Sequence, residues 1–179
     1  MKNPLLLVIS DTHGNTPSLK AVLKWGKKHN VDALVFLGDG TDDIAPAVLE
    51  TGFAAPIKMV RGNGDYNYSI PFNDTLDFAG HTFFLTHGHI SRVSESFSGL
   101  IGAAKSSGAD AALYGHTHIP FWDEAGGILI LNPGTVGAPR SIIGASFAVI
   151  ECPPKEWFKI RYWSIKDGAA GKIIKELLL

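Results

Sequence analysis

Five short apolar runs in this chain each lead into residues of types that bind metal ions. The runs span residues 5–9, 33–37, 57–60, 83–85 and 111–114. They are short and rich in Leu, Val, Ile, Phe and Ala, which predicts buried strands. If they are strands of one sheet, the polar residues after them lie at the strands' carboxyl ends, where open α/β sheets place their active sites. These polar residues are Asp11, His13, Asp39, Asn63, His87, His89, His116 and His118.

The first third of the chain alternates strand and helix. Strands are expected at 5–10, 33–37 and 57–61, and helices at 16–30 and 42–51. Thr16 and Pro17 suit the N-cap and the first position of the first helix. Asp42 and Asp43 are expected to cap the second. Short links between these elements favour a parallel, right-handed βαβαβ beginning.

The remainder is richer in strands. Residues 74–78 and 81–86 flank Ala79-Gly80 and predict a hairpin. A helix is expected at 94–106, and strands at 111–114, 127–131, 146–150 and 157–163, with Pro153-Pro154 marking a turn. A last helix is expected at 167–179. It would bury Ile173, Ile174, Leu177 and Leu178. The order of elements predicts one α/β domain, residues 1–179, with two packed sheets and helices outside.

Composition narrows the class of protein. A chain of 179 residues with 45% hydrophobic residues is long and apolar enough for one packed domain. Its net charge of −1 provides no general attraction to nucleic acid or anionic lipid. Cys152 is the only cysteine, which excludes an internal disulfide. No run is long enough for a signal-peptide core or a membrane span, so we expect a cytoplasmic protein without nucleic-acid or membrane partners, and a homo-oligomer stays an open alternative.

Each polar motif also has a structural explanation when taken alone. Gly38-Asp39-Gly40 and Asn63-Gly64 are typical of tight turns. A pair of residues two apart, such as Asp11 and His13, points to one side in extended chain but could equally be a turn cap and a surface histidine. Five such motifs at the ends of five consecutive strand candidates are too many to attribute to coincidence. The mixture of oxygen and nitrogen ligands suits Mn, Zn or Fe.

The full motif set resembles that of the calcineurin-like metallophosphoesterases. The resemblance is to the small bacterial and archaeal phosphodiesterases of that superfamily, a group that also includes the retromer subunit Vps29. The matching segments are Asp11-Thr12-His13-Gly14, Gly38-Asp39, Gly62-Asn63, Thr86-His87-Gly88-His89, Gly115-His116-Thr117-His118 and Leu131-Asn132-Pro133-Gly134-Thr135, with Pro139-Arg140 after them.

The resemblance implies a four-layer αββα sandwich of two mixed sheets flanked by helices. It also implies two divalent transition-metal ions, Mn foremost, with Zn, Fe or Ni as alternatives. One ion would be held by Asp11, His13, Asp39 and His118, and the other by Asp39, Asn63, His87 and His116. Asp39 would bridge them. A hydroxide between the ions would attack a small phosphodiester.

One position departs from the wider superfamily. Many members have His directly after the metal-binding Asn, where this chain has Gly64. His89 could replace it as a general acid, or it could only orient a ligand. The expected catalytic residues are therefore Asp39, Asn63 and His89.

Substrate contacts are less defined by the sequence. Arg61, Arg92 and Arg140 could grip a phosphate, Arg140 foremost, although each could be a surface charge. Tyr66, Tyr68, Phe72 and Phe97 could form a stacking wall or simply pack within a loop.

Two other functions stay open. The chain could be a nuclease of the same superfamily, which the lack of a basic stripe disfavours. It could also be a protein-binding scaffold like Vps29 with an idle metal site, which the intact ligand set disfavours. Turnover of an aryl phosphodiester with Mn²⁺ separates enzyme from scaffold, and turnover of DNA identifies a nuclease.

Overall fold

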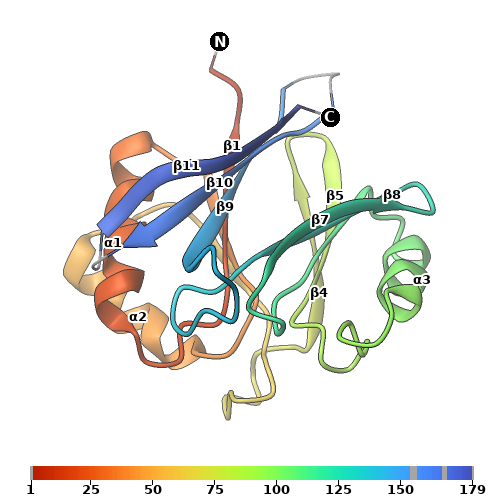
Figure 1. Cartoon of the computed structure of the whole chain (residues 1–179), viewed down its shortest axis with the longest axis horizontal. Coiled ribbons are helices and arrows are strands. Elements are labelled where there is room, and N and C mark those ends of the chain that lie inside the picture. The colour runs from red at the N-terminus through yellow and green to blue at the C-terminus, as the bar shows by residue number, and fades with distance from the viewer. Residues whose placement is uncertain (1, 154–156, 167–168, 179) are drawn as a thin grey trace.

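Two β-sheets lie face to face, with helices on their outer faces (Figure 1). The computed structural model describes residues 2–153, 157–166 and 169–178. Among these residues, no helix is both long and apolar enough to cross a bilayer.

The first sheet has six strands in the order β11-β10-β9-β1-β2-β3. β1 runs parallel to β2 and β2 runs parallel to β3, which confirms the predicted parallel beginning. β9 is antiparallel to β1, and β10 is antiparallel to both β9 and β11. The strand bounds are Leu5–Ile9 (β1), Ala33–Phe36 (β2), Ile57–Met59 (β3), Ala145–Glu151 (β9), Lys159–Lys166 (β10) and Ala169–Leu178 (β11).

The second sheet has five strands in the order β4-β5-β6-β8-β7. Its three inner strands, β5, β6 and β8, are parallel. The edge strands β4 and β7 are antiparallel to their neighbours. The bounds are Asn73–Phe78 (β4), His81–Thr86 (β5), Ala111–Leu113 (β6), Pro120–Ala125 (β7) and Ile128–Pro133 (β8).

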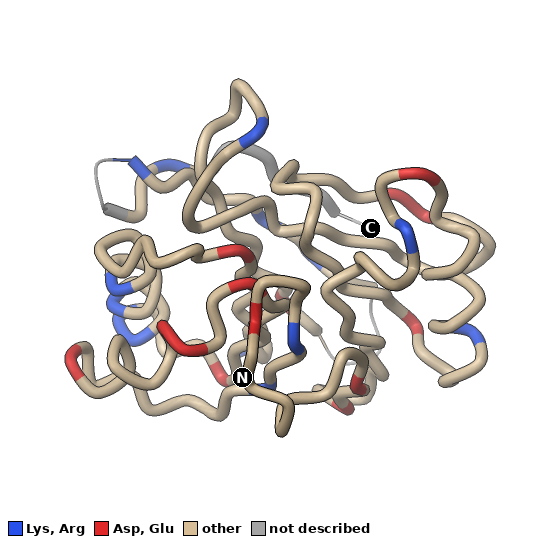
Figure 2. The backbone as a smooth tube through the Cα atoms, turned by 90° about the horizontal axis from the view of Figure 1, so that it is seen from below, with Lys and Arg blue, Asp and Glu red and all other residues tan. Residues whose placement is uncertain are grey.

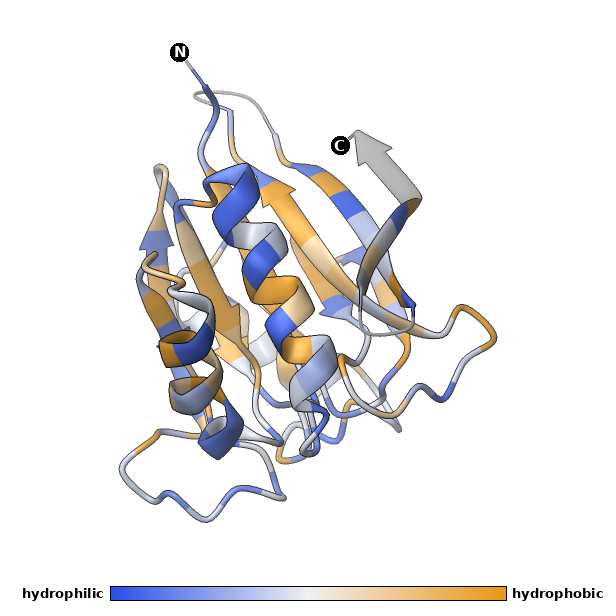
Figure 3. Cartoon of the chain, turned by 90° about the vertical axis from the view of Figure 1, so that its left-hand side faces the viewer, coloured by the Kyte–Doolittle hydropathy of each residue, from blue (hydrophilic) through white to orange (hydrophobic). Residues whose placement is uncertain are grey.

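Helices cover the two outer faces. α1 (Thr16–His29) and α2 (Thr41–Thr51) lie on the first sheet, and α3 (Ser98–Ser106) lies on the second (Figure 1). α1 buries Leu19, Val22 and Leu23 against the sheet, and hydrophilic and hydrophobic residues alternate along its ribbon in Figure 3. Its N-cap is Asn15, whose side chain accepts a hydrogen bond from the Ser18 amide, and not the predicted Thr16.

The buried side chains form three layers of core. Leu6 and Val8 of β1 belong to the cluster between the sheets, while Leu7 and Ile9 belong to the cluster under α1 and α2. A third cluster packs α3 against the second sheet. Alternate residues of a strand point to opposite faces, so a strand buried on both sides has an unbroken apolar run. The four-layer α/β sandwich is thus confirmed, and the helix–sheet–sheet–helix order explains the apolar runs.

The predicted C-terminal helix at 167–179 is wrong. The described part of that segment is β11, which pairs with β10, and Ile173 is 46% exposed instead of buried. Good helix formers in the segment misled the prediction, because pairing with the free edge of β10 overrides intrinsic propensity. Asp167-Gly168 is a dipeptide typical of hairpins and was a usable signal. Residues 167, 168 and 179 lie outside the described residues, as does Pro154 of the predicted Pro-Pro turn.

Two further predictions need correction. The helix expected at 94–106 begins only at Ser98, because the preceding residues form turns in which the Ser96 hydroxyl accepts a hydrogen bond from the Ser98 amide. β7 was not predicted, since its sequence lacks a clear alternation and it forms an edge strand. The other predicted elements are present and differ only in their end residues.

Candidate metal centre

The candidate ligands meet at one edge of the sandwich, where strands of both sheets end. Asp11 follows β1, Asp39 follows β2 and Asn63 follows β3 in the first sheet, while His87 follows β5 and His116 follows β6 in the second. The single sheet considered from the sequence is therefore two sheets, and the site lies across their shared edge. Figure 2 views the molecule from this edge and shows acidic positions near the middle, with basic positions spread more widely.

The loops at this edge hold unusual backbone conformations. Eight described non-glycine residues have a positive φ, and five of them are candidate ligands: Asp11, His13, Asp39, His116 and His118. Such conformations are disfavoured for residues with a side chain and concentrate at functional sites. The sequence argument that Asp11 and His13 point to one side assumed an extended chain. The backbone at these two residues is not extended.

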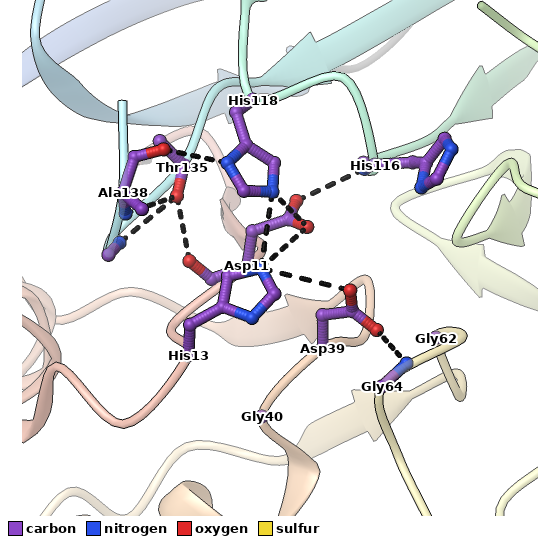
Figure 4. Close-up of polar contacts among 12 residues, drawn as sticks. Asp11, His13, Asp39, Gly40, Gly62, Gly64, His116, His118, Thr135 and Ala138 are labelled. Carbon is purple, nitrogen blue, oxygen red and sulfur yellow. Dashed lines mark hydrogen bonds and ion pairs between the residues drawn. The ribbon is translucent and has the colours of Figure 1, made fainter. Parts of the chain in front are cut away.

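Asp11 is fully buried at the centre of the site (Figure 4). Its Oδ2 accepts a hydrogen bond from the His116 amide at 3.1 Å. Its Oδ1 lies 3.1 Å from His118 Nε2, 3.7 Å from His13 Nε2 and 3.9 Å from His87 Nε2. Burial acts to raise the pKa of Asp11, but the surrounding His118, His13 and His87 lower it well below its usual range. Asp11 is therefore a carboxylate facing three imidazole nitrogens.

Two histidines are held with one ring nitrogen aimed into the site. His87 Nδ1 lies 2.7 Å from the Leu37 carbonyl oxygen, and His118 Nδ1 lies 2.7 Å from that of Ala138. A carbonyl only accepts, so each Nδ1 carries a proton, and in the neutral form of each ring Nε2 then keeps a lone pair. Metal-binding histidines are commonly oriented in this way.

Asp39 faces the same space with one oxygen. Its Oδ1 accepts a hydrogen bond from the Gly64 amide at 2.6 Å. Its Oδ2 lies 3.5 Å from His87 Nε2 and 3.7 Å from His13 Nε2. Burial acts to raise the pKa of Asp39, but His87 and the Gly64 amide lower it. Asp39 thus directs one oxygen, Oδ2, at both histidines.

These side chains form two overlapping groups with metal-ligand geometry. One is Asp11, His13 and His118, and the other is Asp11, Asp39 and His87, with ligand atoms in each group within 4.8 Å of one another. Asp11 Oδ1 and His87 Nε2 are buried and have no hydrogen-bond partner among the described residues. Buried polar atoms without partners are costly, and a divalent cation would satisfy both. The donor set of carboxylates and imidazoles fits such an ion.

Asn63, His116 and His89 lie beside these groups. Asn63 is exposed. The ring of His116 lies 5.2 Å from that of His87, between centroids, and points away from Asp11 in Figure 4. His116 and His118 therefore do not point to the same side.

His89 is close to the centre without joining either group. Its ring lies 5.4 Å from that of His87, and its Nδ1 is buried without a partner in the described chain. Burial, followed by the charges of His87 and His116, lowers the pKa of His89.

Asp65 is the main residue that sequence reasoning missed. Its two carboxylate oxygens accept hydrogen bonds from four backbone amides at 2.8–2.9 Å, those of Asp39, Gly40, Thr41 and Gly62. Burial acts to raise the pKa of Asp65, but these amides lower it. The carboxylate thereby joins the loop that carries Asp39 to the loop that carries Asn63. Its place two residues after Asn63 was the available signal.

Asp65 also replaces the predicted cap of α2. The N-cap of α2 is Gly40, which has no side chain, and the Gly40 and Thr41 amides bind Asp65. Asp43 instead accepts hydrogen bonds from the Gly14 amide and the Thr12 hydroxyl, next to His13.

The three candidate arginines differ in environment. Arg140 is exposed, and Arg92 is exposed and paired with Glu95. Arg61 is buried, 7% exposed, against two aromatic rings. Phe97 packs on Phe121 and Tyr114, under α3, and is separate from the loop that carries Tyr66, Tyr68 and Phe72.

Residues 5–155 match the calcineurin-like phosphoesterase superfamily domain. The chain belongs to this superfamily, and it is a metal-dependent phosphoesterase, a hydrolase.

Individual relatives support this placement. A probable metallophosphoesterase of Methanocaldococcus jannaschii is 32% identical over 174 residues, covering 95% of this chain and 80% of its own. The phosphodiesterase YfcE of Escherichia coli is 29% identical and covers 82% and 86% of the two chains. A crystal structure of a conserved uncharacterized protein and predicted phosphoesterase from Streptococcus pneumoniae superposes with a TM-score of 0.78, at 27% identity and covering 100% of this chain and 99% of its own. Zinc-complexed Vps29 from Entamoeba histolytica shares the fold, with a TM-score of 0.78 at 23% identity and 97% and 98% coverage.

Proposed function

We propose that this protein is a phosphodiesterase that hydrolyses small phosphodiesters at a centre of two divalent transition-metal ions. The observation that carries the proposal is the pair of overlapping ligand groups, in which Asp11 Oδ1 and His87 Nε2 are buried without hydrogen bonds. The similarity to the phosphodiesterase YfcE supports the diester preference.

The proposed ligand sets are those that the resemblance implies; they overlap with the two groups, although Asp11 is common to both groups and Asp39 is the proposed bridge. One ion would be held by Asp11, His13, Asp39 and His118, and the other by Asp39, Asn63, His87 and His116. Asp39 Oδ2, which lies near both His13 and His87, supports its role as the shared ligand. Two bound ions generate a nucleophile from water at neutral pH and neutralise charge that develops on the phosphoryl oxygens. Mn²⁺ is the proposed ion, with Zn²⁺, Fe²⁺ and Ni²⁺ as alternatives.

Backbone groups of the protein hold the proposed ligands in place before a metal ion binds. The carbonyls of Leu37 and Ala138 fix the rings of His87 and His118, so little reorganisation is needed when a ligand binds. The amide of Gly64 holds one oxygen of Asp39 and leaves the other facing the site.

The absence of a side chain at Gly64 sets the expected leaving group. We propose that esters whose leaving oxygen departs without a proton, such as aryl esters, react faster than alkyl esters. Loss of a positioned general acid typically costs about 10²–10⁴-fold for a leaving group that needs a proton. His89 remains the candidate to supply one, since its ring lies 5.4 Å from that of His87. A steep fall in rate with rising leaving-group pKa is expected across substituted phenyl and alkyl phosphodiesters. A flat dependence, with chemistry shown to limit the rate, would mean that another residue supplies the proton, and His89 would be the first candidate to mutate.

The test of the function combines metal content and turnover. After Mn²⁺ loading and desalting, two equivalents per chain and turnover of bis(p-nitrophenyl) phosphate are expected. Asp39→Asn should lose metal and turnover with an unchanged circular dichroism spectrum, because Asp39 lies in a loop at the sheet edge. Asp42→Asn, an exposed carboxylate nearby, is the matched control. Full activity with one equivalent would contradict the binuclear centre.

The other two functions give different outcomes in the same assays. A Vps29-like scaffold would bind metal without turning over any phosphate ester. A nuclease would prefer single-stranded or duplex DNA to small diesters, and the scattered basic positions in Figure 2 disfavour it. The cytoplasmic location, the lack of nucleic-acid partners and self-association stay predictions from the sequence.

A further inference from the structure

Exposed aromatic side chains project from the loop beside the metal centre. The loop between β3 and β4 extends past the edge where β1 and β2 end (Figure 1). It carries Tyr66, Tyr68 and Phe72, which are 79%, 80% and 38% exposed. Large apolar groups gathered on a surface commonly mark a binding site.

Arg61 holds two of these rings from beneath. Its guanidinium carbon lies 3.9 Å from the centroid of Phe72 and 4.6 Å from that of Tyr68. Its Nε and Nη1 are buried with no hydrogen-bond partner in the described residues. The ring faces therefore provide much of the compensation for this buried charge through cation–π attraction. The Arg61 amide also donates to the Pro71 carbonyl at 2.8 Å, so both ends of the residue fasten the loop.

One of the two held rings, Phe72, reaches the proposed ligand His87 through His89. The rings of Phe72 and His89 meet edge to face, with centroids 5.4 Å apart. The ring of His89 in turn lies 5.4 Å from that of His87. An ester whose phosphoryl group reached the metal centre would thus have Phe72 close to its organic group, and Tyr68 lies against the same Arg61 guanidinium as Phe72.

We propose that Tyr68 and Phe72 form an aromatic platform that receives a planar aromatic ester group of the substrate, either an aryl ring or a nucleobase. This inference rests on the proposed phosphodiesterase function and adds the class of substrate. Arg61 occupies one side of each ring, and the solvent-exposed remainder offers a stacking surface. The positive charge of the buried Arg61 also makes the electrostatic potential near the platform more positive, which favours binding of an anionic ester. Tyr66 is equally exposed but makes no described contact with Arg61, so it is not part of the platform.

The test measures binding by calorimetry to the Mn²⁺-loaded protein, so that it does not depend on turnover. Phenylphosphonate is compared with cyclohexylphosphonate, a non-planar ring of similar size. Adenosine 5′-monophosphate is compared with ribose 5-phosphate, which lacks the base. In the wild type, the aromatic member of a pair should bind about tenfold tighter, the usual scale of base–aromatic stacking.

Substitutions in the loop test which residues cause the preference for the aromatic ligand of each pair. Tyr68→Leu and Phe72→Leu should each remove most of it, whereas Tyr66→Leu should retain it and Tyr68→Phe should largely restore it. A preference in the nucleotide pair alone would identify a nucleobase as the occupant, and a preference in both pairs would include aryl groups. Equal binding within both pairs in the wild type, an equal loss with Tyr66→Leu, or no binding of any of the four would overturn the platform. Failure of the proposed function would appear separately, as absent turnover of phosphodiesters by a protein that still binds two Mn²⁺.

Discussion

Asp65→Asn probes the contact on which the shape of the metal centre depends most. Each Asp65 oxygen accepts two backbone amides. Asparagine keeps one oxygen and places an N–H₂ group against the other two amides, so two charge-assisted hydrogen bonds are lost. Such bonds contribute about 1.5–3 kcal/mol each. Because Asp65 is half-buried and the loops relax, we expect the free energy of unfolding to fall by about 2–4 kcal/mol instead of the full sum of about 3–6 kcal/mol.

The same substitution should weaken metal binding. The two freed amides are either those of Asp39 and Gly62 or those of Gly40 and Thr41, and all four lie in the loops that carry the proposed ligands Asp39 and Asn63. Changing a group that orients ligands typically costs about 10–100-fold in metal affinity. Urea unfolding of the metal-free protein and Mn²⁺ calorimetry at a temperature where the variant is folded measure the two effects independently.

Asp32→Asn is the matched control for this experiment. Asp32 accepts one amide hydrogen bond, from Leu5, in an exposed position just before β2. It should lose less stability and keep wild-type Mn²⁺ affinity. Wild-type affinity in Asp65→Asn would refute the positioning role even if stability fell. An unchanged free energy of unfolding in Asp65→Asn would refute the contribution assigned to the lost hydrogen bonds.

Two further predictions concern a glycine and the cysteine. Gly62→Ala should cut Mn²⁺ affinity more than tenfold, because a Cβ there would overlap Asp39 Oδ1 and the Asp39 amide nitrogen, and overpacking commonly costs about 1–3 kcal/mol. Cys152 should not react with a thiol reagent at pH 8 in the native protein, since burial, helped by the charge of Glu151, raises the pKa of its thiol to about 12.

Each of these has its own control. Gly102 lies within α3 with open space around its Cα, so Gly102→Ala should stabilise the protein by about 0.5–1 kcal/mol and leave Mn²⁺ binding unchanged. An unaltered Mn²⁺ affinity in Gly62→Ala would show that the loops yield without moving Asp39. One thiol per chain should react rapidly in denaturant, and rapid reaction in the native state would mean that β9 opens near Cys152.

Most helices and strands of the fold could be predicted, because each has a recognisable pattern of apolar residues within its own segment. A strand buried on both faces has an uninterrupted apolar run, as in β1, and an amphipathic helix has a 3.6-residue period, as in α1. The C-terminal segment contains good helix formers such as Ala, Lys, Glu and Leu, yet residues 169–178 form β11. Pairing with the edge of β10 decides in favour of a strand, and Asp167-Gly168 is the one local signal that we found for it.

The candidate site divides in the same way. Residue types and their place after strands were readable, because parallel strands present their carboxyl ends at a common edge. The direction of each side chain was not readable. His116 and His118 have the same spacing as two residues on one side of a strand, but left-handed backbone at both sends their rings in different directions.

The sequence by itself determined the apolar strands, the two outer helical layers and the identity of the residues offered at the edge, because each depends on neighbours along the chain. The tertiary structure decided which sheet each ligand comes from, which oxygen of Asp39 faces the histidines, and that Asp65 joins two loops through four amides. It also placed Arg61 beneath Tyr68 and Phe72. Such contacts join residues that are far apart in the sequence and that only packing brings together. They contribute a few kcal/mol to the free energy of folding, which outweighs the local conformational preference of single residues.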